Sequence, residues 1–278
     1  MIIFTYWLLI FIVIYVYFGY PLLLLLLNLF RPVSKPVSQA QPLPLVSLLI
    51  SAYNEEEIIE KKLANSLAID YPKNLLEIVV VSDSSDGTNG LVQQYADKGV
   101  KLIVPQGRLG KIPAQNIALP QLKGEIVIFS DADTFCQPDS LTKLIKYFSD
   151  PKIACVVARL VWLNKSDNTI TRGGDLYYKY ESFLRKNESN LGVLGLASTG
   201  LMGFRRELFV PTPPFLAEDT FLPLKFLQSG YKVIFAPEIT TTTYATSNQA
   251  GEYKVRQRNA LIDTSALIYM KSLLNPFG

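Results

Sequence analysis

Two acidic residues, Asp131 and Asp133, directly follow the apolar run EIVIFS and are separated by one residue. Carboxylates this close at the end of a buried strand repel each other unless they share a cation. One carboxylate can reach a sugar hydroxyl or a metal-bound water while the other binds Mg²⁺ or Mn²⁺ directly. An ion held by few protein oxygens keeps positions for phosphate oxygens. The spacing therefore predicts a metal site that accepts a diphosphate group.

Two further polar turns follow apolar runs in the same way. The turn at 52–56 (AYNEE) comes after LVSLLIS, and the turn at 83–88 (DSSDGT) comes after LEIVVVS. Asp, Ser and Asn at the start of a helix also satisfy unpaired backbone N–H groups. Helix capping and ligand binding therefore both stay open for Ser85 and Asp86.

The composition removes several kinds of chemistry. The chain has no histidine, which excludes Ser-His-Asp and Cys-His catalysis and histidine-ligated metals. Its two cysteines, Cys136 and Cys155, cannot form a disulfide framework or a four-ligand zinc site by themselves. A formal net charge of +3 gives no indication of nucleic-acid binding. Acid–base chemistry must therefore come from carboxylates, Lys, Tyr or Cys.

The elements that position these turns are strands alternating with helices. Strands are expected at LVSLLIS, LEIVVVS, VKLIVP and EIVIFS, with helices at EEEIIEKKLANSLA, GLVQQYA and around AQNIAL. Continuous apolar strands separated by helices indicate a mostly parallel sheet covered on both faces. Ligand sites of such α/β sheets form where the strands end, which is where the polar turns lie.

The first 30 residues predict a membrane anchor. Residues 2–30 carry no charged side chain and as a helix would span roughly 43 Å. The run is too long for a cleaved signal peptide and has no basic start. Gly19 and Pro21 could kink the helix. Arg31 and Lys35 follow the run, so the rest of the chain is expected in the cytoplasm, attached to the lipid bilayer through a proline-rich linker at 31–44.

Five motifs in order give the sequence a resemblance to the family 2 glycosyltransferases with a GT-A fold, over about residues 45–269. They are Ser51–Glu56, Asp83, Gly110-Lys111 followed by Asn116, Asp131-Ala132-Asp133, and Ala217-Glu218-Asp219. The resemblance implies an α/β GT-A domain at 45–250, a Rossmann-like mostly parallel sheet with helices on both faces. The segment 251–278 would then be a closing helix that packs on the domain or lies along the membrane.

The resemblance also implies roles for single residues. Asp219 would be the general base of an inverting transfer, and Asp131 and Asp133 would hold Mg²⁺ or Mn²⁺ against the diphosphate. The donor would be a UDP-sugar. Its contacts are expected from Ala52, Tyr53, Glu55, Asp83, Lys111, Asp131, Arg256 and Arg258. Acceptor contacts are expected from Ser198, Thr199, Gly200 and Glu218.

Several of these residues have a structural alternative. Lys111 could be a solvated lysine at a helix start, and Glu218 or Asp219 could cap the helix that follows. The small residues Ser198, Thr199 and Gly200 could simply allow close packing. A basic helix near a membrane would equally explain Arg256 and Arg258.

The sequence departs from the pattern of processive synthases. Many such members carry Gln-x-x-Arg-Trp after the ED motif, whereas residues 256–260 read RQRNA without tryptophan. Relatives with this anchor often continue into further membrane helices, whereas this sequence stops at LLNPFG. A cytoplasmic site beside a bilayer favours a glycan or lipid-linked acceptor in cell-surface polysaccharide synthesis, with other membrane synthase subunits as possible partners.

Three other classes of function compete with this interpretation. DADT at 131–134 also matches the start of a haloacid-dehalogenase phosphatase, in which Asp131 would be the nucleophile, but that motif belongs on an early strand. A glycosyltransferase-like domain could serve as a non-catalytic membrane partner of another synthase, although Asp133 and Asp219 are both present. A nicotinamide-dependent oxidoreductase is disfavoured because no G-x-G-x-x-G follows the first strand.

Overall fold

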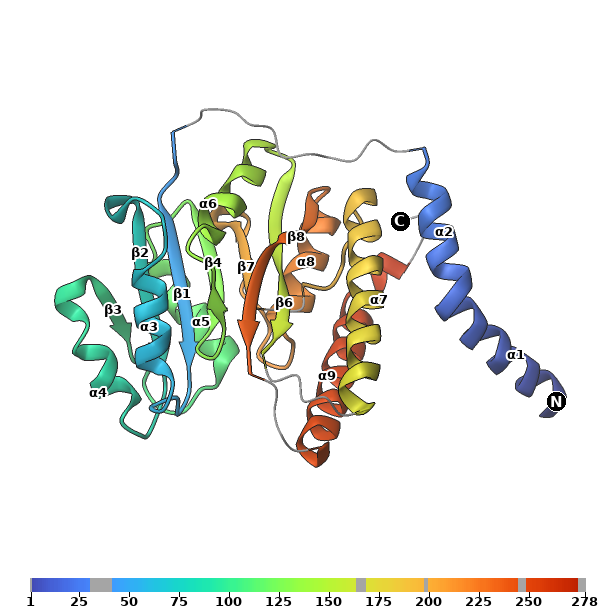
Figure 1. The fold of residues 1–278 in the computed structure, drawn as a ribbon, viewed down its shortest axis with the longest axis horizontal. Coiled ribbons are helices and arrows are strands. Elements are labelled where there is room, and N and C mark those ends of the chain that lie inside the picture. The colour runs from blue at the N-terminus through green and yellow to red at the C-terminus, as the bar shows by residue number, and fades with distance from the viewer. Residues whose placement is uncertain (1, 31–41, 164–168, 198–199, 245–248, 275–278) are drawn as a thin grey trace.

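A computed structural model describes residues 2–30, 42–163, 169–197, 200–244 and 249–274. Within these ranges a mixed eight-stranded sheet lies between two layers of helices, and a long N-terminal helix projects from one side (Figure 1). The strand order is β3-β2-β1-β4-β7-β6-β8-β5. The alternation of strands and helices that the sequence predicts is therefore confirmed.

Four parallel strands form the first half of the sheet. They are β1 (Val46–Ala52), β2 (Leu76–Ser82), β3 (Val100–Ile103) and β4 (Ile126–Asp131). Ala52 pairs with Ser82, and Ser51 pairs with Asp131, so the carboxyl ends of β1, β2 and β4 meet at one edge of the sheet. The three polar turns of the sequence emerge from this edge.

The second half of the sheet mixes strand directions. It contains β5 (Phe135–Cys136), β6 (Ile153–Trp162), β7 (Leu201–Arg205) and β8 (Lys232–Thr243). Strand β7 runs antiparallel to both β4 and β6, whereas β6 and β8 run parallel to each other. Because β7 is antiparallel, its first residues lie at the same edge as the end of β4, where Ser130 pairs with Leu201.

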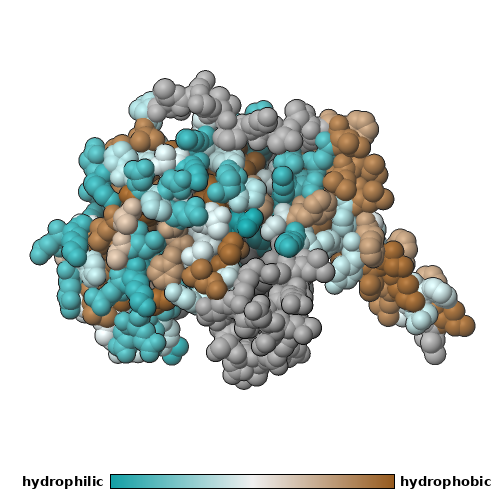
Figure 2. Space-filling model, viewed as in Figure 1, coloured by the Kyte–Doolittle hydropathy of each residue, from teal (hydrophilic) through white to brown (hydrophobic). Residues whose placement is uncertain are grey.

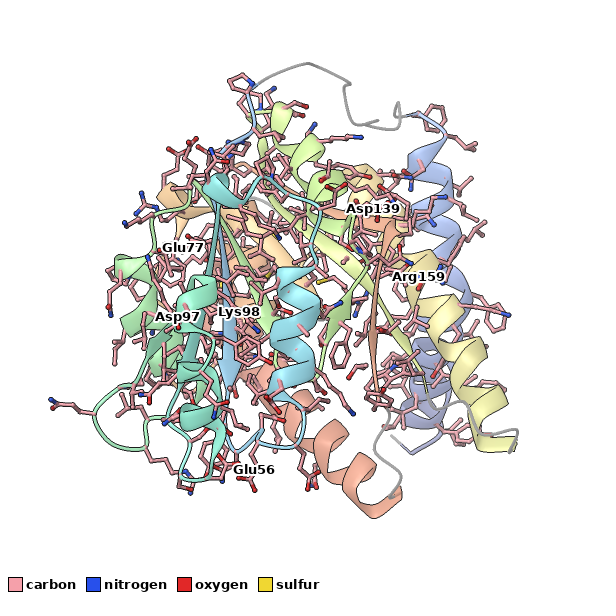
Figure 3. All side chains as sticks on the ribbon, turned by 60° about the vertical axis from the view of Figure 1, so that its left-hand side comes forward. Glu56, Glu77, Asp97, Lys98, Asp139 and Arg159 are labelled. Atoms are coloured by element: carbon pink, nitrogen blue, oxygen red, sulfur yellow. The ribbon has the colours of Figure 1, made fainter. Side chains whose placement is uncertain are left out.

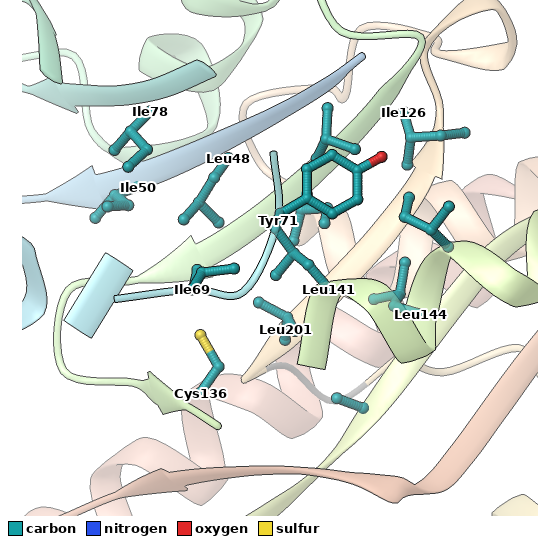
Figure 4. Close-up of a cluster of buried hydrophobic side chains, with 14 of the residues drawn as sticks. Leu48, Ile50, Ile69, Tyr71, Ile78, Ile126, Cys136, Leu141, Leu144 and Leu201 are labelled. Atoms are coloured by element: carbon teal, nitrogen blue, oxygen red, sulfur yellow. The ribbon is translucent and has the colours of Figure 1, made fainter. Parts of the chain in front are cut away.

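Within the described residues, six helices contribute buried apolar side chains to the two cores that flank the sheet. One core joins the sheet to α3 (Ile59–Leu67), α4 (Thr88–Gln93) and α6 (Ser140–Ile145), and part of it is drawn in Figure 4. The other core joins it to α5 (Lys111–Ala118), α8 (Glu218–Gln228) and α9 (Gln249–Tyr269). Short 3₁₀ turns lie at Lys73–Leu75, Ala96–Lys98, Leu119–Gln121, Lys146–Ser149, Arg206–Leu208 and Lys271–Leu274.

The N-terminal apolar run is helical throughout the described residues. It consists of α1 (Ile2–Ile14), a π-helical turn at Tyr15–Gly19 and α2 (Tyr20–Asn28). Residues Ile3–Asn28 are long and apolar enough to cross a membrane, and most of this surface is exposed, as the brown helix of Figure 2 shows. Pro21 lacks the N–H that would bond the Tyr17 carbonyl, so the irregular turn falls where a proline disturbs the α-helical pattern.

The anchor packs against α7 (Thr169–Leu191) through polar contacts. The Tyr180 hydroxyl donates to the Val16 carbonyl, within the π turn, at 3.0 Å. The Tyr20 hydroxyl donates to Glu188 Oε1 at 2.6 Å, and Asn28 Nδ2 donates to Asn187 Oδ1 at 3.1 Å. The α/β domain therefore touches the N-terminal apolar helix directly. Most of the expected linker, residues 31–41, lies outside the described residues.

The closing helix begins two residues before the expected boundary at 251, because α9 starts at Gln249. Ala266 of α9 and Met270, which directly follows the helix, are buried in the same core as α8, so α9 packs on the α/β domain. Leu261, Leu267, Ile268 and Tyr269 on the same helix are exposed. The helix thus contacts the domain and also presents apolar residues to its surroundings.

Candidate active site

The polar turns gather at the edge toward which β1, β2 and β4 point. In Figure 3, Glu56 lies at this edge and Glu77, near the start of β2, lies toward the opposite end of the strands. Two groups of residues can be distinguished there. We call residues 53–56 and 83–88 the nucleotide-side loops, and we call Lys111, Asp131, Glu218, Asp219 and Asp263 the acidic cluster.

The nucleotide-side loops are joined by reciprocal hydrogen bonds. Asn54 N donates to Ser84 Oγ at 2.8 Å, and Ser85 N donates to Asn54 Oδ1 at 2.9 Å. Asn54 adopts a positive φ of 55°, a conformation that asparagine tolerates better than most side chains. Asn54 therefore shapes the turn after β1 and also connects it to the turn after β2.

The sequence left helix capping and ligand binding open for Asp86, and in the structure Asp86 bonds the first N–H group of α4. Its Oδ1 accepts from Thr88 N at 3.0 Å, at the start of α4, and its Oδ2 accepts from Glu56 N at 3.3 Å. Glu56 Oε2 in return accepts from Gly87 N at 2.9 Å. The polar groups of these loops thus largely satisfy one another.

Asp83 and Tyr53 lie beside the loop that precedes α5. Asp83 Oδ2 accepts from the backbone N–H groups of Leu109 at 2.9 Å and Gly110 at 2.8 Å, and Gly110 has a positive φ of 84°. The Tyr53 side chain is exposed, and the Arg108 guanidinium lies 4.7 Å from the centre of its ring. A flat aromatic face next to a carboxylate suits a nucleobase, although Asp83 also has this loop-holding role.

Lys111 is the centre of the acidic cluster. Its Nζ lies 2.7 Å from Asp131 Oδ1 and 2.7 Å from Glu218 Oε1, so it joins the start of α5 to the end of β4 and the start of α8. Burial alone would lower the pKa of Lys111, but the Glu218 and Asp131 carboxylates raise it above its ordinary value. Lys111 is thus an ion-paired lysine that bridges three elements. Of the two carboxylates that pair with Lys111, that of Glu218 is buried.

The Asp219 carboxyl group has a raised pKa. Burial, the neighbouring Glu218 and the more distant Asp263 and Asp131 carboxylates raise the pKa of Asp219 to about 7, while Lys111 opposes the shift. A carboxylate with such a pKa can accept a proton at neutral pH. The Asp219 carbonyl accepts from Ala197 N at 2.8 Å, which joins the start of α8 to the segment before β7.

Asp263 belongs to the cluster although no sequence motif pointed to it. It lies on α9, and its Oδ1 accepts from Thr220 Oγ1 at 2.6 Å in the first turn of α8. The only available signal was an acidic residue in a mostly apolar closing helix. Arg108 and Thr243 were likewise not selected from the sequence, because each comes from a segment without a motif.

Asp133 lies on the other side of the turn after β4. Its Oδ2 accepts from Thr243 Oγ1 at 3.0 Å, at the end of β8. Burial and the carboxylates of Asp133, Asp131 and Asp86 raise the pKa of Glu55 above its ordinary value. Negative charge is therefore concentrated around this turn, and its hard oxygen donors fit Mg²⁺ or Mn²⁺. Within the described residues no three acidic or sulfur ligands form a complete metal cage, so substrate oxygens and water would complete the coordination.

The expected acceptor segment is described only in part. Ser198 and Thr199 lie outside the described residues. Gly200 is buried, and a Cβ there would come within 2.3 Å of Thr241 Oγ1 and 2.7 Å of Leu160 Cδ1, so close packing is one reason for glycine at this position. Arg256 and Arg258 fall within α9, but their side chains lie outside what the structure describes.

Asn116 of the Gly-Lys...Asn motif makes backbone contacts. Its Nδ2 donates to the Thr212 carbonyl at 2.8 Å, and Thr212 N donates to its Oδ1 at 3.1 Å. This pair fixes the segment between β7 and α8 against α5. The motif thus positions the chain that leads to Glu218 and Asp219.

The fold and the strand-end acidic turns are those of a nucleotide-sugar transferase with the GT-A architecture. A mannosyltransferase from Pyrobaculum calidifontis, solved with GDP-Man and Mn²⁺, matches with a TM-score of 0.77 and 27% identity, over 94% of this chain and 74% of that one. The model described as glycosyl transferase family 2 matches residues 47–210, so the chain belongs to this family. The resemblance seen in the sequence and its fold class are therefore confirmed.

Curated relatives give the same assignment. An N-acetylglucosaminyltransferase of Sinorhizobium fredii (strain NBRC 101917 / NGR234) is 27% identical over 242 residues, which cover 81% of this chain and 58% of the relative. A beta-monoglucosyldiacylglycerol synthase of Trichormus variabilis is 32% identical over 158 residues, which cover 55% of this chain and 34% of the relative. The chain thus spans between about a third and three fifths of the lengths of these two proteins. Within the described residues three strands precede β4, the strand that ends at Asp131, which also disfavours the phosphatase alternative.

Proposed function

We propose that the protein transfers a sugar from a nucleotide-sugar donor to a hydroxyl group of a glycan or lipid-linked acceptor, with inversion at the anomeric carbon. The observation that carries this proposal is the acidic cluster. A bridging lysine holds the end of β4 beside the start of α8, and next to it stands a carboxylate whose pKa lies near neutrality. The donor would lie against the nucleotide-side loops, and the acceptor would approach from the side of Asp219.

In the proposed reaction Asp219 acts as general base. It takes the proton from the acceptor hydroxyl as that oxygen forms a bond to the anomeric carbon, and the bond from this carbon to the diphosphate breaks. Because burial and neighbouring carboxylates raise the pKa of Asp219 to about 7, a large share is ionised at neutral pH and can accept this proton. The displacement needs no covalent enzyme intermediate.

Other residues of the cluster hold the reacting groups in place. Lys111 pairs with Asp131 and Glu218 and lies where a donor phosphate or sugar would arrive. Asp133, with Asp131 beside it, would hold Mg²⁺ or Mn²⁺. When bound, such an ion supplies Lewis-acid stabilisation of the departing nucleoside diphosphate. The Mn²⁺ of the Pyrobaculum calidifontis mannosyltransferase structure supports a divalent ion at this kind of site.

We propose UDP as the nucleotide, with Tyr53 stacking on the base and Asp83 reaching its polar edge. The Tyr53 ring is exposed and the Asp83 carboxylate lies in the adjoining loop, which supports base recognition there. The Pyrobaculum calidifontis protein was solved with GDP-Man, so GDP-sugars must be tested beside UDP-sugars. The names of the curated relatives include both N-acetylglucosaminyl and glucosyl transfer.

The acceptor is proposed to belong to a membrane or to a growing polysaccharide. The apolar helix Ile3–Asn28 and its contacts with α7 support attachment of the domain to a bilayer, with the active site on the cytoplasmic side. The Trichormus variabilis relative is named for a diacylglycerol glycolipid, which supports a lipid acceptor. Other synthase subunits in the membrane are a further proposed set of partners.

Release of nucleoside diphosphate from a panel of UDP- and GDP-sugars, with and without Mn²⁺ or Mg²⁺, tests this function. We expect metal-dependent turnover of one UDP-sugar in the presence of a lipid or glycan acceptor, and a product of inverted configuration by NMR. Asp133→Ala should abolish the metal response. If no sugar nucleotide binds or turns over under any of these conditions, the proposed function is wrong.

A further inference from the structure

Lys62 on α3 is a buried lysine directly behind the turn that carries Asp131 and Asp133. Its side chain has 0% exposure and is among the largest fully buried side chains of the described residues. Its Nζ donates to Ser130 Oγ at 2.7 Å and also to the Thr134 carbonyl. A lysine is rarely fully buried unless a specific partner requires it.

The surroundings of Lys62 argue against a role in packing alone. Burial lowers the pKa of Lys62, which means that the site disfavours its charge, although Cys136, Asp131 and Asp133 favour it. Among the described residues, the hydrogen-bond acceptors of Nζ are a hydroxyl and a carbonyl oxygen, not a carboxylate. An apolar side chain of similar volume would avoid the desolvation cost. Packing alone therefore does not explain a lysine here.

The two residues that Lys62 contacts lie at either end of the turn that carries Asp131 and Asp133. Ser130 immediately precedes Asp131, and Thr134 immediately follows Asp133. Asn65, also on α3, contacts the segment just after this turn. Its Nδ2 donates to the Cys136 carbonyl at 2.9 Å, and Cys136 N donates to Asn65 Oδ1 at 3.0 Å. Helix α3 thus holds the whole segment from the end of β4 to β5.

We propose that Lys62 is a positioning residue for the donor site: by holding both ends of the turn, its Nζ keeps the Asp131 and Asp133 carboxylates together and aimed at the diphosphate and its metal. This inference rests on the proposed function for its consequence, but the positioning itself is a property of the fold. Thr243 of β8 also holds the turn, through its hydrogen bond to Asp133. The turn is therefore supported from two sides, by Thr243 on β8 and by Lys62 on α3.

Hydrogen exchange of the full chain tests the positioning without any substrate. Lys62→Met keeps an unbranched side chain of similar length and removes the charged group. We expect faster amide exchange in the peptide covering 130–136, with exchange of β1 and β2 unchanged. Ser66→Ala is the matched control, because Ser66 is buried on the same helix and bonds the Lys62 carbonyl at 2.9 Å without touching the turn. Equal exchange of 130–136 in Lys62→Met and the parent would overturn the proposal.

Ser130→Ala provides a second variant if Lys62→Met does not fold. It removes one acceptor of Nζ and leaves the lysine in place. We expect a smaller increase of exchange in the same peptide. Unchanged exchange in this variant would equally overturn the proposal.

The consequence for the donor site is measured by Mn²⁺ titration of UDP binding and of turnover. A group that orients metal ligands typically changes metal affinity or activity by about 10–100-fold, so Lys62→Met should raise the half-saturating Mn²⁺ concentration by about tenfold or more. Ser66→Ala should leave it unchanged. A lower Mn²⁺ requirement would mean that Lys62 acts only as a nearby positive charge, and an unchanged one would mean a structural role only; either result contradicts the proposal. If the parent binds no nucleotide, the proposed function fails, while the exchange data still decide the positioning role.

Discussion

The nucleotide-side loops and the acidic cluster lie at the same edge of the sheet but differ in how their polar groups are satisfied. In the loops, Asn54, Glu56 and Asp86 exchange hydrogen bonds with neighbouring backbone and hydroxyl groups. In the cluster, the Asp131 and Glu218 carboxylates both pair with Lys111, and the pKa of Asp219 is raised to about 7. The first arrangement is typical of a rigid scaffold, whereas the second concentrates perturbed charges where chemistry is expected.

The largest effect should come from Asp219→Asn in the acidic cluster. The substitution keeps the size of the side chain but removes the proton acceptor, so kcat should fall by about 10²–10⁴-fold. Binding of Mn²⁺ and UDP, measured by calorimetry, should change little because the proposed role of Asp219 is toward the acceptor and not the donor. Turnover close to that of the parent would remove Asp219 from the mechanism.

Lys111→Met should reduce both stability and activity. It leaves the buried Glu218 carboxylate without a cation, at a cost of roughly 1–3 kcal/mol in the free energy of unfolding. Because Lys111 opposes the rise of the Asp219 pKa, the acid limb of the kcat profile should also move to higher pH. Urea unfolding and a pH–rate profile measure the two effects, with Lys111→Arg as the charge-preserving control. An acid limb that stays in place would separate Lys111 from Asp219.

Asp86→Ala should affect the scaffold and leave the chemistry intact. It removes the hydrogen bonds to Thr88 N and Glu56 N, which should lower the free energy of unfolding by about 1 kcal/mol. The pH dependence of kcat should be that of the parent. A displaced pH profile would show that the loops and the cluster are not electrostatically distinct.

The smallest expected effect is a shift of the pH profile in Asp263→Asn. Asp263 raises the pKa of Asp219, so its neutralisation should move the acid limb of kcat to lower pH, in the direction opposite to Lys111→Met. The amide can keep a hydrogen bond from Thr220, which limits the loss of stability. A shift to higher pH would contradict the assigned origin of the Asp219 pKa.

Part of this site could be predicted because its residues follow strands. LVSLLIS, LEIVVVS and EIVIFS are apolar on both faces, so they had to be central parallel strands, and the residues after them had to meet at one edge. Lys111 and Asp219 were found through motifs. The position of Lys111 between Asp131 and Glu218 could not be predicted, because it depends on how α5 and α8 pack on the sheet.

Other contributions depend on tertiary contacts that no local pattern encodes. Asp263 and Thr243 come from the last helix and the last strand, far from the motifs in the chain. Lys62 lies in a helix with an otherwise ordinary amphipathic sequence. Its side chain is buried because it packs against the turn between Ser130 and Thr134. The hydrogen bond from Tyr180 to the π turn at Tyr15–Gly19 likewise depends on α7, which packs against the N-terminal helix.

The central claim is that the acidic cluster and the nucleotide-side loops form one site for transfer, and a crystal structure tests it most directly. The Asp219→Asn variant would be crystallised with Mn²⁺ and the UDP-sugar that the donor panel identifies. We predict the metal on Asp133, the base beside Tyr53 and Asp83, and the sugar between the diphosphate and the side chain at position 219. A donor bound away from this edge, or a sugar far from position 219, would contradict the account.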